Sequence, residues 1–431
     1  MKGSGDLVSR ASLSYGELIA LEEPGSRLSF GELEVCVARR AARLRALSGC
    51  RVALPAPESI EGIVHLLALH RAGALVVLTN RSLPAAALEA LHRRWDLWNS
   101  QASGAPGQPR EGGSAPGIVV LTSGSSGGAK GVIHQEASLE ASARGANKHL
   151  AFGPGGRWVV TLPMNHVGGL AILYRALTSG GTMVFPPDRR DLLVALREAT
   201  HISLVSTQLG RLLEVWASQP PEELERILMG GSPIPSGLSD RAVRKGWPIV
   251  VSYGMTEMGS LVTATEVGVT SSSGGVLEGR RLRIGEAGQI EVGGGALFSG
   301  YLDGPEAGEW HKTGDMGSLN EHGELVVRGR IDNMFISGGE NVHPESIEEA
   351  IRATQGVDDA VVVPVPDTEF GARPVAFVSG SASFPDVENA VRALIPGYMV
   401  PVRWRVLPPC PEGALKWSRA VLTRMAVQEE D

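Results

Sequence analysis

Short apolar runs and amphipathic segments follow one another in a regular order along the first part of the chain. Residues 51–56 (RVALPA) and 74–80 (ALVVLTN) are apolar runs typical of buried strands, and residues 59–73 between them carry apolar positions at helical spacing. Before them, Ser29 and Glu32 form the pattern of a capping box at the start of another helix. This order predicts parallel strands covered by helices.

The alternation continues further along the chain and then changes. Further strand-like runs lie at 117–124, 158–163, 182–186, 202–207 and 248–254. From about residue 282 the strands become shorter, at 282–294 and 323–332, which predicts an antiparallel or barrel-like subdomain. After Asp332 a compact pattern of helix, two strands, helix and an extended run lies at 344–354, 359–365, 374–379, 385–395 and 402–407.

We therefore predict an α/β fold in two domains. Residues 1–331 form a large N-terminal domain with parallel α/β subdomains and a β-barrel-like subdomain, and residues 332–431 form a small, mobile α+β domain. Residues 99–117 are rich in Gly, Pro and Ser and are expected to form an exposed loop.

Composition and charge narrow the class of protein. The 431 residues are 43% hydrophobic and 20% charged, as in a globular protein, and the net charge of -7 argues against a nucleic-acid partner. Cys36, Cys50 and Cys410 match no disulfide or metal spacing. The N-terminus has no signal-peptide pattern, and the apolar stretch 60–78 is interrupted by charged residues. We expect a cytoplasmic protein that does not bind membranes.

A stretch rich in glycine and hydroxyl groups follows the apolar run IVVL. Its predicted phosphate-binding residues are Thr122, Ser123, Gly124, Ser125, Ser126, Gly127 and Lys130. Glycines let backbone N–H groups approach a polyphosphate, hydroxyls donate further hydrogen bonds, and a lysine supplies a cation. It is not a Walker A loop, because no glycine precedes the lysine and no Ser or Thr follows it. The alternative is a flexible surface loop.

This stretch resembles the phosphate loop of the adenylate-forming superfamily, which includes acyl- and aryl-CoA synthetases, adenylation domains of peptide synthetases and luciferases. Four further segments resemble motifs of that superfamily in the same order along the chain. They are YGMTE at 253–257, WHKTGD at 310–315, GRID followed by ISGGEN at 329–332 and 336–341, and LKWSR at 415–419. Five motifs in order make the resemblance specific.

The resemblance implies roles for the residues in these motifs. Thr256 would bind the α-phosphate of ATP, Glu257 would hold Mg²⁺, and Asp315 would accept hydrogen bonds from the ribose. The other residues placed at ATP are Gly231, Ser232, Tyr253, Gly254, Met255 and Arg330. For Arg330 a surface ion pair is the alternative.

The C-terminal motifs imply a moving domain. Lys416 would be a catalytic residue with Thr256 and Glu257, bridging the substrate carboxylate and the α-phosphate. Asp332 would be the hinge about which the small domain turns between two half-reactions, and residues 338–341 would face the active site in the thiol-transfer pose. Three positions depart from the usual pattern, namely Ala129, Asn333 and Leu415.

The acid pocket is expected between the nucleotide motifs, at 162–170, 206–213 and 230–235. The first two segments are similar to those of the o-succinylbenzoate–CoA ligases of menaquinone biosynthesis. Their acid carries a second carboxylate, which needs a donor or a cation, and the candidates are His166, Gln208, Arg211 and Ser232. Structural roles remain open for His166 and Arg211.

The predicted function is ATP-dependent ligation of a carboxylic acid to coenzyme A through an acyl-adenylate, with o-succinylbenzoate as the acid. ATP, Mg²⁺ and coenzyme A are the expected cofactors and co-substrates, and a homodimer is left open. The alternatives are another aryl- or acyl-CoA ligase, an adenylation enzyme that loads a carrier protein, and a binding protein that keeps the fold without catalysis.

Overall fold

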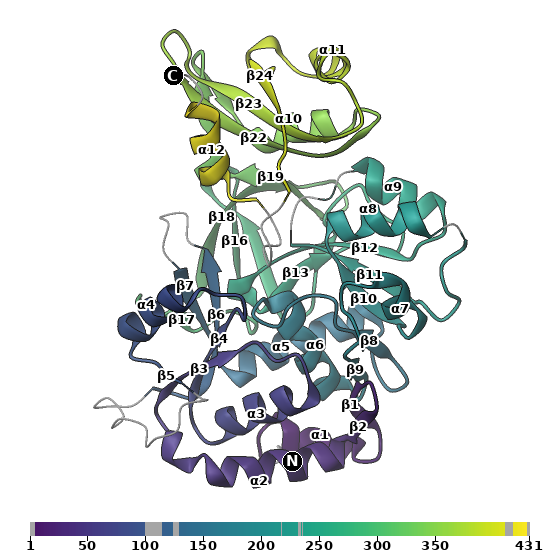
Figure 1. The fold of residues 1–431 in the computed structure, drawn as a ribbon, viewed down its shortest axis with the longest axis vertical. Helices are drawn as coiled ribbons and strands as arrows, with labels where there is room; N and C mark the ends of the chain where they lie inside the picture. The colour runs from purple at the N-terminus through teal and green to yellow at the C-terminus, as the bar shows by residue number, and fades with distance from the viewer. Residues whose placement is uncertain are drawn as a thin grey trace.

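The computed structural model describes residues 5–99, 114–123, 129–216, 218–231, 234, 236–409 and 417–428. Two large sheets lie in the lower part of Figure 1, a smaller antiparallel sheet stands above them, and a separate sheet with its own helices lies at the top. None of the described helices combines the length and the apolar character that a membrane span needs.

The first large sheet consists mainly of parallel strands. In spatial order its strands are β14 (Gly275–Val276), β13 (Ser260–Ala264), β12 (Ile249–Met255), β11 (Arg226–Met229), β10 (His201–Leu204), β8 (Arg157–Val159), β9 (Thr182–Val184), β1 (Ile19–Glu23) and β2 (Ser26–Ser29). The strands from β12 through β10, β8 and β9 to β1 run parallel, while β13, β14 and β2 pair antiparallel. The parallel strands predicted here are confirmed.

The second large sheet carries the predicted phosphate loop. Its strands in spatial order are β17 (Gly300–Tyr301), β7 (Ala129–His134), β6 (Gly117–Ser123), β4 (Leu75–Thr79), β3 (Arg51–Pro55) and β5 (Trp98–Asn99). The strands from β6 to β5 are parallel, and β6 turns back into β7 as an antiparallel hairpin.

Helices cover both faces of these sheets. A cluster of buried apolar side chains joins the two sheets through α1 (Leu7–Tyr15), α2 (Phe30–Arg43), α3 (Ile60–Arg71), α5 (Glu136–Leu150) and α6 (Val167–Ser179). On the outer faces lie α4 (Ala85–Trp95) against the second sheet, and α7 (Leu192–Arg197), α8 (Ser206–Val215) and α9 (Ser236–Arg244) against the first. Successive residues of a strand point to opposite faces of the sheet. In β3, Val52 packs in the cluster shared by the two sheets, and Ala53 packs in the cluster under α4.

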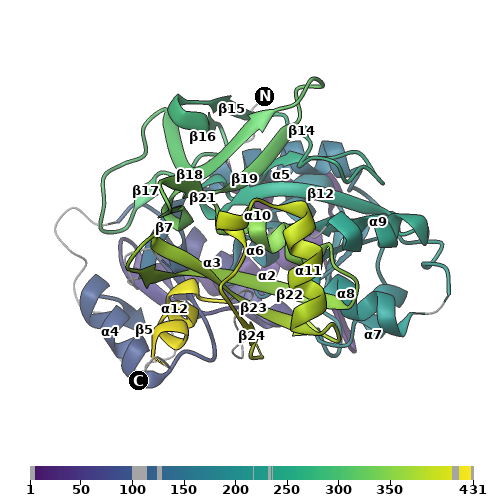
Figure 2. The ribbon, with the colours of Figure 1, turned by 90° about the horizontal axis from the view of Figure 1, so that it is seen from above.

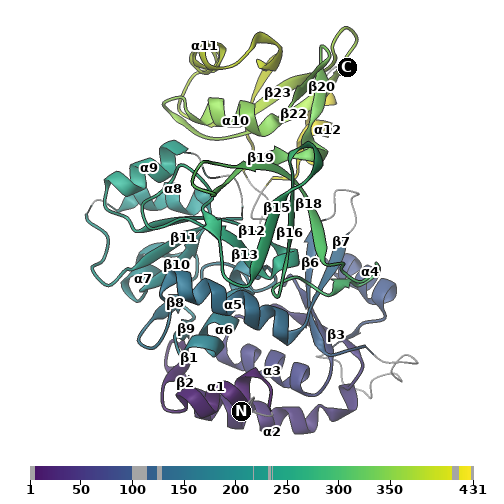
Figure 3. The same ribbon diagram turned by 180° about the vertical axis from the view of Figure 1, so that it is seen from behind.

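The predicted antiparallel subdomain is a four-stranded sheet. Its strands are β15 (Arg280–Ile284), β16 (Gln289–Gly294), β18 (Trp310–Leu319) and β19 (Leu325–Arg330), and each neighbouring pair is antiparallel. Seen from behind in Figure 3, this sheet stands between the two large sheets and the C-terminal part of the chain.

The C-terminal part forms its own sheet with helices on both faces (Figure 2). Its strands are β20 (Phe335–Ser337), β21 (Glu340–Val342), β22 (Val357–Asp367), β23 (Gly371–Gly380) and β24 (Arg403–Val406). The helices α10 (Pro344–Arg352) and α11 (Phe384–Leu394) pack on the face that includes Val362, and α12 (Arg419–Val427) packs on the face that includes Val363. Alternation of apolar residues along β22 therefore gives this domain two small cores.

The local predictions are mostly confirmed. Ser29 caps α2, and its capping box with Glu32 is present. The run predicted as a strand at 202–207 was too long, because β10 ends at Leu204 and α8 begins at Ser206. Most of the predicted loop at 99–117 lies outside the described residues. The boundary between residues 331 and 332 stays a prediction.

Candidate active site

The predicted phosphate loop connects the two strands of a hairpin. β6 ends at Ser123, β7 begins at Ala129, and Thr122 pairs with Lys130 across the hairpin. Thr122 is half-buried and Lys130 is exposed. Gly124, Ser125, Ser126 and Gly127 lie outside the described residues, as does the side chain of Ser123. The strands thus hold a hydroxyl and a cation side by side at the base of the loop.

The aromatic residue of YGMTE is joined to the carboxylate of TGD. The Tyr253 hydroxyl donates to Asp315 Oδ2 at 2.7 Å, and Arg330 Nη1 donates to Asp315 Oδ1 at 3.1 Å. Burial and Asp315 raise the pKa of the Tyr253 hydroxyl, so that it stays a donor at neutral pH. Arg330 also pairs with Asp332 at 3.3 Å. Three predicted nucleotide residues therefore form one hydrogen-bonded chain across two sheets.

The end of β12 places the rest of the YGMTE motif. A side chain at Gly254 would put its Cβ 2.3 Å from the Ser260 carbonyl, so that the close turn into β13 needs glycine. Met255 ends the strand, and Thr256 begins a short 3₁₀ turn, η2 (Thr256–Met258). Gly231, which follows β11, has a positive φ of +83° and is exposed, and Ser232 lies outside the described residues.

A buried histidine that the sequence analysis did not single out supports Thr256. His134 ends β7, and its Nε2 lies 2.8 Å from the carbonyl oxygen of Thr256, which can only accept. Its Nδ1 is buried without a hydrogen-bond partner among the described residues. Burial lowers the pKa of His134 to about 4, so the ring is neutral at pH 7. It joins the strand of the phosphate loop to the motif that follows β12.

Glu257 lies within a cluster of three other polar groups. The Tyr301 hydroxyl donates to Glu257 Oε1 at 2.9 Å, and Lys130 Nζ lies 5.7 Å from the centre of the Tyr301 ring. His311 packs 5.2 Å from the ring of Phe298. Burial lowers the pKa of His311 against the opposing effect of Glu257, and Lys130 lowers it further. Lys130, Glu257 and His311 are therefore close enough to act on one another.

The residues around Glu257 fit a magnesium ion. Mg²⁺ in nucleotide sites is commonly held by one or two carboxylates together with phosphate oxygens and water. Glu257 is half-buried, and its carboxylate has an ordered hydroxyl partner at one oxygen. Among the residues that the structure describes, no three His, Cys, Asp or Glu side chains form a group that could hold a metal by themselves. Phosphate oxygens would have to complete the coordination of an ion at Glu257.

The four candidates for the acid pocket lie in different surroundings. His166 is the N-cap residue of α6 and is half-buried. Gln208 Oε1 accepts the backbone N–H of Val205 at 3.0 Å, which makes this side chain a cap of α8. Arg211 is exposed on the same helix, and Ser232 lies outside the described residues. The roles of these four residues at the acid stay predictions.

Arg175 is a buried cation that was not among the residues predicted for the acid pocket. It lies on α6 with 1% of its surface exposed, donates from Nη2 to Ser260 Oγ at 3.1 Å, and stacks 4.5 Å from the centre of the Trp158 ring. Its Nε and Nη1 have no hydrogen-bond partner among the described residues. Burial and the nearby Arg280 lower its pKa to about 9.

Such an arrangement is costly for the folded protein. A buried cation normally has a carboxylate partner and satisfied donors, and leaving buried donors unpaired destabilises the folded state. Arg175 lies beside Ser260, three residues beyond Glu257, so its unpaired donors lie near the predicted site. A role for Arg175 could not be predicted from the sequence, because the apolar residues around it at 170–177 predict only a core helix.

The predicted catalytic lysine and hinge belong to the C-terminal part. Lys416 lies outside the described residues, whereas Arg419 of the same motif begins α12. Asp332 lies in the short turn η4 (Ile331–Asn333) between β19 and β20. Residues 338–341 are exposed.

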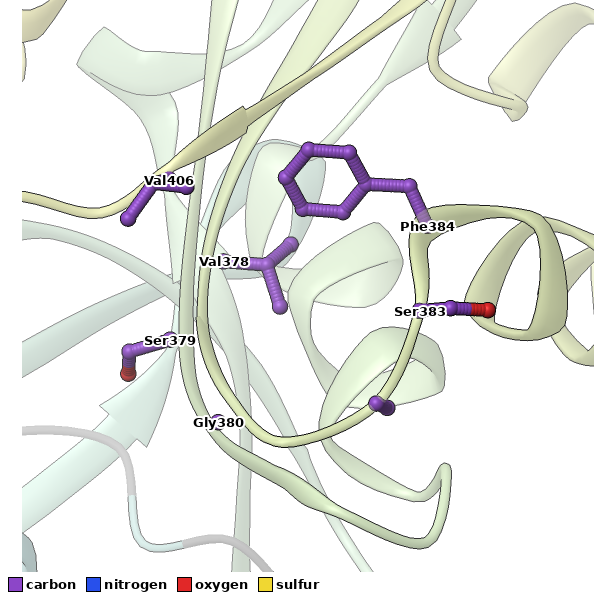
Figure 4. Close-up of a pocket in the computed structure, with 7 residues that line it drawn as sticks. Val378, Ser379, Gly380, Ser383, Phe384 and Val406 are labelled. Carbon is purple, nitrogen blue, oxygen red and sulfur yellow. The ribbon is translucent and has the colours of Figure 1, made fainter.

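The described pocket of the C-terminal part is a separate feature. It has a volume of about 350 Å³ and is lined by residues of β23, β24 and the start of α11, among them Val378, Phe384 and Val406 (Figure 4). Its lining contains no charged side chain. It therefore offers no group for the chemistry expected of the motifs.

Comparison with known proteins agrees with the order of the motifs. The model of the AMP-binding enzyme family matches residues 8–96 and 91–302, and that of the AMP-binding enzyme C-terminal domain matches residues 346–412. The chain is 36% identical over 400 residues to the 2-succinylbenzoate–CoA ligase of Salmonella typhimurium, covering 87% of each chain. It is 32% identical over 442 residues to the enzyme of that name from Escherichia coli K12, covering 96% of this chain and 97% of the relative.

A solved structure extends this similarity to the fold. A variant of E. coli MenE with bound OSB-AMS superposes with a TM-score of 0.85 at 30% identity and covers 100% of both chains. The family models span most of the chain, and the relatives match almost all of it. This chain belongs to the AMP-binding enzyme family.

Proposed function

We propose that the chain is an ATP-dependent acid–CoA ligase that converts o-succinylbenzoate, ATP and coenzyme A into o-succinylbenzoyl-CoA, AMP and pyrophosphate. The observation that carries the adenylating chemistry is that residues of separate motifs meet in two groups, Asp315 with Arg330 and, around Tyr301, Glu257 with Lys130. The identity of the acid is supported by the two relatives of that name, which match at 36% and 32% identity.

In the first half-reaction an oxygen of the substrate carboxylate attacks the α-phosphorus of ATP, and the bond to pyrophosphate breaks. Both reactants are anionic, so the site must offset their repulsion and hold them in line. Asp315 would accept from the ribose hydroxyls, with Tyr253 and Arg330 fixing its two oxygens. Thr256 would donate to the α-phosphate, and His134 fixes the backbone from which it projects.

Two cations of the chain and one bound ion would offset the remaining charge. Lys130 lies at the base of the phosphate loop, and Lys416 would bridge the carboxylate and the α-phosphate. A magnesium ion at Glu257 would neutralise charge on the leaving pyrophosphate. In the second half-reaction the thiolate of coenzyme A attacks the acyl carbon, and AMP leaves as the carbon–oxygen bond breaks.

Arg175 is the cation best placed for the second carboxylate of the acid. Its two unpaired donors and its position beside Ser260 match the need for a charge-assisted hydrogen bond inside an apolar pocket. This role would explain why two donors of a fully buried arginine, Nε and Nη1, have no hydrogen-bond partner among the described residues. Arg211, predicted for this role, is exposed on α8.

The test is product formation by the purified protein with ATP, Mg²⁺, coenzyme A and o-succinylbenzoate. We expect equal amounts of the CoA thioester and AMP, and no reaction without the acid. Turnover with benzoate or anthranilate but not with o-succinylbenzoate would overturn the acid and leave the mechanism. Transfer to a phosphopantetheinylated carrier protein but not to free coenzyme A would overturn the acceptor.

Three narrower expectations complete the proposal. Residues 1–331 and 332–431 would be two domains with Asp332 as the hinge, the enzyme would act in the cytoplasm, and a homodimer is left to be tested. Sedimentation of the purified chain would measure its mass in solution, and cell fractionation would locate it.

A further inference from the structure

Arg419 anchors the segment that carries Lys416. Its Nη1 donates to Glu348 Oε1 at 2.5 Å and also to the Val362 carbonyl, and its Nη2 donates to Glu345 Oε1 at 3.2 Å. Burial lowers the pKa of Arg419, but Glu348 and Glu345 raise it more, so the guanidinium stays charged. Three residues span at most about 11 Å, so Arg419 limits where Lys416 can lie.

The same oxygen of Glu345 is also bound to the hinge segment. Asn333 Nδ2 donates to Glu345 Oε1 at 2.6 Å, and Asn333 follows the predicted hinge residue Asp332 directly. Asn333 is one of the positions at which this chain departs from the usual family pattern. Glu345 therefore connects the hinge segment to the anchor of the lysine segment through one atom.

The second oxygen of Glu345 lies against the other side of the hinge. Oε2 is buried without a hydrogen-bond partner among the described residues. A Cβ at Gly329, in β19, would lie 2.7 Å from this oxygen, so the carboxylate packs closely against the backbone there. The carboxylate thus touches residues on both sides of Asp332, and its position depends on how the small domain lies.

Residues 338–341, which the family resemblance places at the active site during thiol transfer, are exposed in the structure. In Figure 1, α12 lies on the side of the C-terminal domain that faces β18 and β19. The helix that begins at Arg419 therefore lies next to the part of the chain that carries the nucleotide motifs.

We propose that Glu345 is a positioning residue for adenylate formation, which sets the lysine segment relative to the hinge through Asn333 and Arg419. This inference rests on the proposed two-step function. Loss of the contact should slow the step that needs Lys416 and leave the transfer step unchanged.

The experiment uses the full-length enzyme and exchanges the roles of Asn333, which donates a hydrogen bond, and Glu345, which carries the negative charge. In Asn333→Asp, a carboxylate faces Glu345, and we expect single-turnover adenylate formation to slow about tenfold, the size of one lost hydrogen bond to a charged group. Transfer to coenzyme A from supplied acyl-adenylate should stay within about twofold. In the double variant Asn333→Asp with Glu345→Gln, the amide nitrogen can donate to the new carboxylate but cannot accept from Arg419, so adenylate formation should recover in part.

Matched variants separate this role from general damage. Asn389→Asp makes the same chemical change on the exposed face of α11 and should leave both steps unchanged. Asn333→Ala removes the donor to Glu345 without adding a charge and should slow adenylate formation in the same selective way. If the Asn333→Asp chain fails to fold, as judged by circular dichroism, Asn333→Ala supplies the decision.

Two outcomes would overturn the inference. One is equal slowing of both half-reactions in Asn333→Asp or Asn333→Ala, and the other is a double variant as slow as Asn333→Asp alone. Failure of the proposed function would look different, because the wild-type enzyme would then form no thioester with o-succinylbenzoate. In that case the ratio of the half-reactions is measured with whichever acid supports pyrophosphate exchange.

Discussion

The Tyr301 hydroxyl donates a hydrogen bond of 2.9 Å to Oε1 of Glu257, the carboxylate predicted to hold magnesium. Tyr301 lies in β17, which pairs with β7 beside the phosphate loop, so one side chain couples the loop strand to the metal ligand. Burial and Glu257 raise the pKa of Tyr301, which keeps the hydroxyl a donor. Partners of this kind orient metal ligands and restrict their rotamers.

Tyr301→Phe should therefore weaken magnesium binding more than folding. Phenylalanine keeps the ring that packs on Phe298 and loses only the hydrogen bond. We expect the magnesium concentration needed for half-maximal pyrophosphate exchange to rise about tenfold, the lower end of the effect of such partners on metal affinity. An unchanged magnesium requirement would show that Tyr301 does not orient Glu257. Tyr398→Phe, at a partly buried tyrosine that packs against the core of the C-terminal part, controls for the loss of a hydroxyl elsewhere in the chain.

Because His134 is buried in its neutral form, we expect the free energy of unfolding to fall in acid. Its pKa is lowered to about 4 in the folded state from 6.5, so the unfolded chain binds more protons between these values. The contribution of the neutral ring is complete above about pH 6.5 and is lost as the pH falls towards 4, by about 3 kcal/mol. Thermal unfolding between pH 7 and pH 4.5 measures this loss.

The matched comparison is between two glutamine variants. His134→Gln can keep an N–H near the Thr256 carbonyl and removes the titrating ring, so its unfolding temperature should fall less steeply with acid than that of the wild type. His322→Gln, at a position where 73% of the side chain is exposed, should keep the wild-type slope. Equal slopes in all three proteins would mean that His134 does not titrate on unfolding.

The fold and the order of the motifs could be predicted because their signals are local. The capping box of Ser29 and Glu32 spans four residues, and the strand before the phosphate loop is a continuous apolar run. The partners of the site residues could not be predicted in this way. Tyr301 and Glu257 are 44 residues apart, and His134 and Thr256 are 122 apart, so only the packing of separate sheets brings them together.

The acid side of the site shows a different reason for failure. The sequence predicts Arg211 at the acid because a cation on a helix near the motifs suits an anionic group, yet Arg211 is exposed. Arg175 lies among apolar residues, and a lone arginine in such a helix carries no sequence signal of its own. Its significance comes from burial and from donors left without partners, and these are properties of the folded chain.

Lys416→Ala tests the lysine that the resemblance identifies. Because its ammonium would stabilise charge that develops in the transition state of adenylation, we expect that step to slow by at least about a hundredfold. Transfer from supplied acyl-adenylate to coenzyme A should be almost unchanged. Lys148→Ala removes a lysine whose side chain is 75% exposed and serves as the control. Full adenylation by Lys416→Ala would contradict the proposed mechanism.

Arg175→Met separates acid binding from folding, because the two effects should have opposite signs. Methionine removes a buried cation with unpaired donors and keeps much of its volume, so the unfolding temperature should stay level or rise. The KM for o-succinylbenzoate should rise by about a hundredfold if Arg175 holds the second carboxylate through charge-assisted hydrogen bonds. The KM for ATP should change little. Arg211→Met, on the exposed face of α8, should alter neither property. If Arg175→Met leaves the KM for the acid unchanged and Arg211→Met raises it, Arg211 and not Arg175 binds the second carboxylate.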